Sequence, residues 1–135
     1  MTLTIRLAVA ALAISIGRSF IDWGFVYPEF GMTQPAAVFG TLVGYVLAYG
    51  TWVWAVVALA RGRRAGMWVA LGATLVLSDL LGISTTVALC PTPCGTIYPV
   101  AEIWNWLTTV SGIAATVALV RSLRSMQGQV AVGAP

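Results

Sequence analysis

The stretch 36–60 reads AAVFGTLVGYVLAYGTWVWAVVALA, and none of its 25 residues is charged. A helix needs about 20 apolar residues to cross the roughly 30 Å of hydrocarbon in a bilayer, so this stretch is long enough. A strand is a poor alternative, because apolar and polar residues do not alternate with period two. The stretch therefore predicts a membrane-spanning helix, and the rest of the chain is interpreted from it.

The composition extends this interpretation to all 135 residues. Hydrophobic residues make up 59% of the chain and charged residues only 8%, whereas a soluble domain carries about 25% charged residues. Histidine is absent from the sequence, which excludes His-ligated haem, Ser-His-Asp and Cys-His catalysis, and zinc sites that contain His. We therefore expect no catalytic residues, no cofactor and no metal site, and the composition favours a protein that is not an enzyme.

Four apolar runs divide the chain. We predict helices near 3–26, 36–60, 66–89 and 97–120, which together form an all-α, polytopic integral membrane four-helix bundle over residues 1–126. Prolines lie between these spans or in their first turns, where they cost no helix hydrogen bond. The final segment, 127–135, is small and polar, and we expect it to be a flexible cytoplasmic tail.

The basic residues fall on one side of this four-span arrangement. Arg6, the Arg61–Arg64 turn, Arg121 and Arg124 lie on that side, while the opposite loops carry acidic residues and no basic one. Short basic loops stay in the cytoplasm, so we expect both termini to lie in the cytoplasm. The helices are then expected to lie in the inner (cytoplasmic) membrane of the cell, with the lipid bilayer as a partner. We expect the first helix to be retained, because its cleavage as a secretory signal would leave an odd number of spans. No basic patch with interleaved aromatic residues points to nucleic acid.

Small residues recur at four-residue spacing along the predicted spans. Lipid is as apolar as the helices, so close van der Waals approach between small residues drives their association. These faces indicate where the helices pack against one another or against another copy or subunit. The positions are Gly40, Gly44 and Ala48 in the second span, Gly66, Ala70, Thr74, Ser78 and Gly82 in the third, and Thr108, Gly112 and Thr116 in the fourth.

Aromatic residues gather near the outer ends of the spans, Trp23 and Trp106 among them. Indole and phenol rings prefer the level of the lipid headgroups, where one edge of the ring is hydrated. For these residues the sequence favours interfacial anchoring over a cage for a ligand.

Four charged side chains belong to the outer half of the predicted bundle and form a candidate intramembrane polar site: Arg18, Asp22, Asp79 and Glu102. A charge deep in a bilayer costs about 2.5–3.5 kcal/mol on the insertion scale, so such residues find partners or line a wet cavity. Three roles are open to Asp79: an ion pair with Arg18, a protonated carboxyl hydrogen-bonded to nearby hydroxyls, or a cation- or proton-binding group in an outward-facing cavity. Asp22 is a competing partner for Arg18, four residues on along the same helix face. Glu102 suits the positive end of the fourth helix as a cap.

The two cysteines form the sequence Cys90-Pro-Thr-Pro-Cys94 in the outer loop between the third and fourth spans. We expect a disulfide there, because thiols oxidise on the outer face of the membrane. This layout resembles that of the DsbB and vitamin K epoxide reductase families, whose thiol–disulfide chemistry uses C-x-x-C together with a second cysteine pair. Here the spacing is C-x-x-x-C and the chain has no further cysteine, so a disulfide that shapes the loop is favoured over a redox centre.

These features lead to one favoured function and two alternatives. The favoured function is association of helices, as a homo-oligomer or as an accessory subunit of a larger membrane complex, because packing faces are abundant and no catalytic set of residues is present. The first alternative is a small transporter or ligand-binding bundle with an outward-facing polar vestibule around Asp79 and Arg18. The second is a membrane thiol–disulfide oxidoreductase that uses Cys90 and Cys94.

Overall fold

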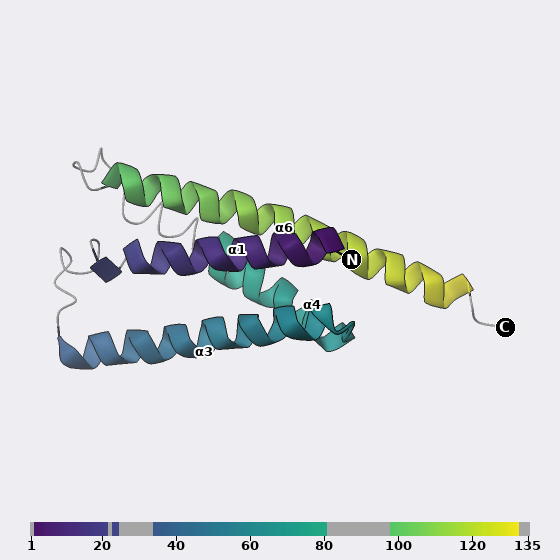
Figure 1. Cartoon of the computed structure of the whole chain (residues 1–135), viewed down its shortest axis with the longest axis horizontal. Helices are drawn as coiled ribbons and strands as arrows, with labels where there is room; N and C mark the ends of the chain where they lie inside the picture. Colours follow the sequence, from purple (N-terminus) through teal and green to yellow (C-terminus); the bar gives the residue numbers. More distant parts are fainter. Residues whose placement is uncertain (1, 22, 25–33, 81–97, 133–135) are drawn as a thin grey trace.

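The computed structural model describes residues 2–21, 23–24, 34–80 and 98–132, and most of them are helical (Figure 1). The helices are α1 (Thr2–Ile21), α3 (Pro35–Ala60), α4 (Arg64–Ala73), the π-helix η2 (Thr74–Leu80) and α6 (Tyr98–Val132). No strand occurs among the described residues. The all-α prediction is confirmed for this part of the chain.

The bounds of α3 follow local signals in the sequence. The helix begins at Pro35 and ends at Ala60, as expected, because the first turn of a helix does not need the N–H that proline lacks. The turn after it is closed by a 2.9 Å hydrogen bond from Gly62 N to the carbonyl of Leu59. Gly62 has a φ of +73°, a conformation that a residue without a Cβ adopts with little strain.

α6 is longer than the sequence indicated. It continues past residue 120 to Val132 and includes most of the segment 127–135 that was expected to be a flexible tail. The residues after Val120 read RSLRSMQ, with no Gly or Pro before Gly128. Arg, Leu, Met and Gln all favour the helical state, so the helix does not stop where the apolar run stops.

Three helices are long and apolar enough to cross a membrane, over Leu3–Ile21, Val38–Ala60 and Glu102–Met126. They correspond to the first, second and fourth expected spans. The third expected span, 66–89, is described as far as Leu80, where it consists of α4 followed directly by η2. These helices make the chain compatible with a membrane protein.

α1 and the continuous pair α4–η2 hold the helices together. α1 contacts α6 and α3, α4 packs mainly against α3, and η2 packs against α6 and α1. In Figure 1 the beginning of α1, the turn between α3 and α4, and the last part of α6 lie toward the same end of the molecule. These three segments carry Arg6, the Arg61–Arg64 turn, Arg121 and Arg124, so six of the seven arginines belong to the segments at that end.

Two apolar clusters form the core. The first joins α1, α3 and α6, and the second joins α3, α4 and α6 near the arginine-rich end. The buried residues of the first cluster are Ala8, Ala11, Leu12, Trp52, Val56 and Ala115. Those of the second are Ala55, Leu59, Met67, Ala70, Leu119 and Leu123. Small alanines beside large side chains let the helix axes come close.

The small-residue row of the third span faces the interior. Gly66, Ala70, Thr74 and Ser78 are all buried, and a Cβ on Gly66 would lie 2.6 Å from the backbone nitrogen of Leu59. Real Cβ atoms essentially never come this close to a backbone atom, so glycine permits the contact between α3 and α4.

The small-residue row of α3 behaves differently. Gly40 and Gly44 are exposed, and a Cβ on either one would have no atom within 4 Å. Ala48 is half-buried. Within the part of the chain that the structure describes, Gly40 and Gly44 therefore lie on an open surface and take no part in the packing between helices.

Candidate functional site

Ser78 and Asp79 direct two polar side chains into the interior, where η2 meets α6 and α1. Ser78 is fully buried and Asp79 is 9% exposed. Both belong to η2, a π-helix of seven residues. Short π-helical turns are rare and occur frequently at functional sites, and this one contains the buried acid of the third span. The candidate site is centred on these two residues.

The Asp79 carboxyl lies against α6. Its Oδ2 accepts a 3.2 Å hydrogen bond from Thr116 Oγ1, while its Oδ1 is buried and finds no hydrogen-bond partner among the described residues. Gly112 makes this approach possible, because a Cβ there would overlap Oδ1 and would lie 2.5 Å from Ser78 Oγ. Burying a charged oxygen without compensation is expensive, so Oδ1 is the atom of the site that most needs a proton or another positive partner.

Hydroxyl groups connect η2 to both neighbouring helices. Ser78 Oγ donates a 2.8 Å hydrogen bond to the backbone carbonyl of Thr108 on α6. The same hydroxyl lies 3.5 Å from Ser15 Oγ on α1. Thr108 in turn donates through Oγ1 to the carbonyl of Trp104 at 2.7 Å. Ser78 is thus the point at which α1, η2 and α6 meet through polar atoms.

Arg18 and Asn105 are further buried polar side chains in this part of the molecule, and each is 6% exposed. Arg18 lies three residues beyond Ser15, so the two share one face of α1. The Asn105 Oδ1 atom is buried and has no hydrogen-bond partner. The structure turns both Arg18 and Asp79 inward, but within the described residues the hydrogen bond to the Asp79 carboxyl comes from Thr116 and not from Arg18.

The other predicted site residues stand apart from this cluster or are not described. Glu102 is exposed on the first turns of α6. Asp22, Gly82, Cys90 and Cys94 lie outside the described residues. The pairing of Arg18 with Asp22 and the disulfide of the outer loop therefore stay predictions.

The chemistry open to the cluster follows from its donor set. No group of three His, Cys, Asp or Glu side chains gathers among the described residues. Next to Asp79, the hydroxyl of Thr116 donates to its carboxyl and Gly112 lies against it. One carboxyl among hydroxyls suits the binding of a proton or of a hydrogen-bonding ligand better than acid–base catalysis, which uses groups placed on both sides of a reacting bond.

Two residues that the polar pattern did not single out are central to the site. Thr116 supplies the hydrogen bond to Asp79, and Gly112 supplies the space for it. The signal for both was the spacing of Thr108, Gly112 and Thr116, which indicated a packing face on the fourth span. The spacing does not show that this face of α6 contacts the carboxyl of Asp79. The contact depends on how α6 and η2 are rotated about their axes.

We compared the chain with models of known protein families, with curated proteins and with solved structures, and none of them matches.

Proposed function

We propose that this chain is a small integral membrane four-helix bundle with both termini in the cytoplasm, and that it works by association as a homo-oligomer or as an accessory subunit of a membrane complex. The observation that carries the proposal is the open glycine face of α3. Gly40 and Gly44 lie one turn apart, and no atom of the described residues lies within 4 Å of a Cβ built on either one. Small residues at this spacing are typical of faces where a second membrane helix packs closely.

A groove beside this face supports the proposal. It is a shallow, open groove of about 640 Å³ between α3 and the α4–η2 pair. Its lining includes Gly44, Ala48 and Gly72, with Leu47 and Val76 among the larger side chains. Small residues allow a helix backbone to come close, and the larger ones give it side chains to interlock with. The occupant that we propose first is a helix of a second copy.

The test is the association state of the full chain in lipid vesicles, measured by single-molecule photobleaching over a range of protein-to-lipid ratios. Gly44→Leu blocks the open face and should weaken association at least tenfold, which corresponds to about 1.4 kcal/mol. Gly50→Leu is the matched control, because Gly50 is also open but lies on another side of α3. A chain that stays monomeric at every dilution and co-purifies from native membranes with no other protein contradicts the proposal. A monomer that co-purifies with another membrane protein through Gly44 identifies an accessory subunit.

The buried Oδ1 of Asp79 favours a second candidate function, a small transporter or ligand-binding bundle. An ionised carboxyl in the interior of a bundle needs a compensating positive charge, and the described contacts of Oδ1 supply none. A proton or a cationic ligand that binds Asp79 reversibly would supply this positive charge. Arg18 and Glu102 would belong to the polar vestibule on the outer side.

Proton uptake into proteoliposomes that contain a trapped pH-sensitive dye tests this candidate. Asp79→Asn should abolish uptake and leave association unchanged, whereas Thr109→Val, which removes a buried hydroxyl elsewhere on α6, should retain uptake. Equal uptake by wild type and Asp79→Asn removes a proton-carrying role for this carboxyl.

A further inference from the structure

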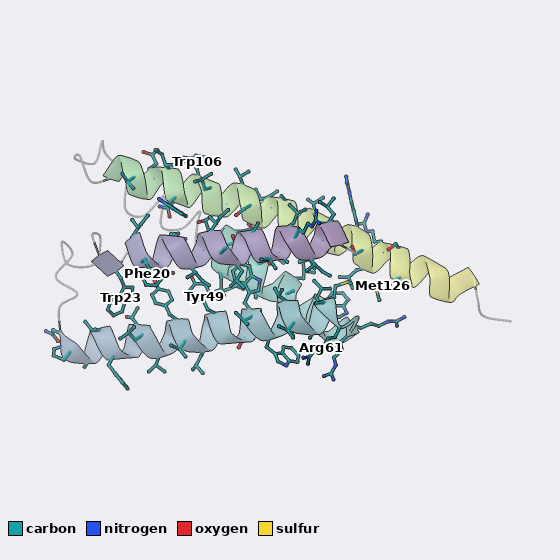
Figure 2. The ribbon with its side chains drawn as sticks, viewed as in Figure 1. Phe20, Trp23, Tyr49, Arg61, Trp106 and Met126 are labelled. Carbon is teal, nitrogen blue, oxygen red and sulfur yellow. The ribbon has the colours of Figure 1, made fainter. Side chains whose placement is uncertain are left out.

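A cavity of about 240 Å³ lies between α1 and α3, in the half of these helices away from the arginine-rich end. Four aromatic side chains line it: Phe20 on α1, Trp23 just beyond that helix, and Tyr45 and Tyr49 on α3. Figure 2 shows Phe20, Trp23 and Tyr49 in the space between the two helices. Neither the open glycine face nor the Asp79 site uses these rings.

The surface of the cavity is almost wholly apolar, although three hydroxyl-bearing residues line it, Ser19, Tyr45 and Tyr49. Tyr49 OH donates a 2.9 Å hydrogen bond to the Ser15 carbonyl and lies 2.5 Å from Ser19 Oγ. These hydroxyls satisfy one another and the backbone, so the cavity presents hydrocarbon and aromatic surface. The rings of Tyr45 and Tyr49 are stacked, with centroids 5.7 Å apart and planes 22° apart. None of the described residues that line the cavity is charged.

We propose that this cavity binds the ring system of a neutral, membrane-soluble aromatic molecule. The volume sets the size of the guest. A dry apolar cavity of about 150 Å³ in another protein holds one benzene ring, so about 240 Å³ holds one or two fused rings. The cavity is partly open, and two of its lining residues, Phe20 and Leu42, are 74% and 46% exposed.

The physical reason for an aromatic guest is the composition of the walls. The hydrocarbon of a bilayer is as apolar as the cavity, so a lipid chain gains no hydrophobic free energy by entering it. A planar ring does gain, because it makes offset-stacked or edge-to-face contacts with Phe20, Trp23, Tyr45 and Tyr49. A cationic ring would be attracted to the ring faces, but it would lose its hydration without an acidic partner among the described lining residues.

This inference rests on the membrane location proposed above but not on association or on Asp79. Gly44→Leu and Asp79→Asn should both leave the binding of aromatic molecules unchanged. Failure of the cavity proposal is thereby distinguishable from failure of either proposed function.

The test is photolabelling of the full chain in phosphatidylcholine vesicles with 1-azidonaphthalene, followed by mass spectrometry of its peptides. We expect saturable labelling within 16–23 and 42–49. An excess of 2-methylnaphthalene should reduce it at least tenfold, and hexadecane should not reduce it.

Variants separate the cavity from the surrounding lipid surface. Leu42→Trp fills the cavity and should lower labelling at least tenfold. Val46→Trp adds the same ring to an exposed position of α3 and should not lower it. Tyr45→Leu keeps an apolar wall but removes one ring, and should weaken labelling severalfold while the helix content, measured by circular dichroism, is retained.

Three results would overturn the proposal. Competition by hexadecane as strong as that by 2-methylnaphthalene would show that lipid chains fill the cavity. Competition by 1-methylquinolinium as strong as that by the neutral ring would show that charge is not excluded. An equal effect of Leu42→Trp and Val46→Trp would show that the label reports the lipid-facing surface.

Discussion

Replacing Gly112 by alanine tests the packing of the Asp79 site most directly. The new Cβ would overlap Asp79 Oδ1 and would lie 2.5 Å from Ser78 Oγ and 2.7 Å from Ser78 Cβ. Ordinary contact begins at 3.4 Å, so η2 and α6 must separate by about 0.7 Å to relieve the carbon–carbon contact alone. Because Ser78 is fully buried against the Thr108 carbonyl, its side chain has no open space to enter.

The cost follows from the contacts that are forced apart. Overpacking a core typically costs about 1–3 kcal/mol, and loss of the hydrogen bond from Ser78 to Thr108 adds about 0.5–1.5 kcal/mol. The higher helix propensity of alanine stabilises α6 by up to about 1 kcal/mol and offsets part of this cost. We therefore expect Gly112→Ala to lower the free energy of unfolding by about 0.5–4.5 kcal/mol.

The assay is equilibrium unfolding in mixed dodecyl maltoside and SDS micelles, followed by far-UV circular dichroism as the SDS fraction rises. Gly50→Ala is the control, because a Cβ on Gly50 meets no atom within 4 Å, and it should leave stability unchanged or raise it slightly. Adding Ser78→Gly to Gly112→Ala removes two of the clashing atoms, so the double variant should lose less than the sum of the single losses. Identical unfolding midpoints for Gly112→Ala, Gly50→Ala and wild type would refute the close contact between η2 and α6.

Three further predictions address other contacts. Gly66→Ala places a Cβ 2.6 Å from a backbone nitrogen of α3 and should cost about 1–3 kcal/mol in the same SDS titration, whereas Gly72→Ala, with open space at its Cβ position, should cost nothing. Thr116→Val keeps the shape of the side chain but removes the hydrogen-bond donor to Asp79, so the free energy of unfolding in the same titration should fall by about 1–3 kcal/mol. In a chain that already carries Asp79→Leu, Thr116→Val should cause no such loss. Replacing the arginines of the Arg61–Arg64 turn by glutamine removes the strongest orientation signal, so labelling of an added cysteine at the C-terminus by a membrane-impermeant maleimide on intact cells should rise from background. Unchanged protection of that cysteine would contradict the proposed orientation.

Much of the fold was predictable because it depends on properties of single segments. The end of α3 at Ala60 and the start of α4 at Arg64 follow from an apolar run that stops at a glycine-containing basic turn. The end of α6 differs from the end of the predicted span at residue 120, because an apolar run and a helix need not end at the same residue. Helix propensity continues past that point, and α6 continues with it.

The candidate site was predictable only in part. Asp79 and Arg18 stood out as charges in apolar runs, and the structure buries both. Their neighbours did not stand out, because threonine and glycine are common in such helices and their spacing serves packing equally well. Of the four rings around the cavity between α1 and α3, the sequence singles out only Trp23, as an anchor at the membrane interface. That it lies beside Phe20, Tyr45 and Tyr49 depends on how α1 and α3 pack together.

That this chain is helical, and where its long apolar segments lie, follows from the sequence, because the length of an apolar run and the position of an arginine cluster do not depend on what lies beside them. The contact of Asp79 with Gly112 and the outward orientation of the exposed glycines of α3 emerge only when the helices pack together. Helices that are apolar on nearly every side have no strong amphipathic signal to orient them. Their rotation about their own axes is set by van der Waals fit between neighbours, and that fit exists only once the helices are together.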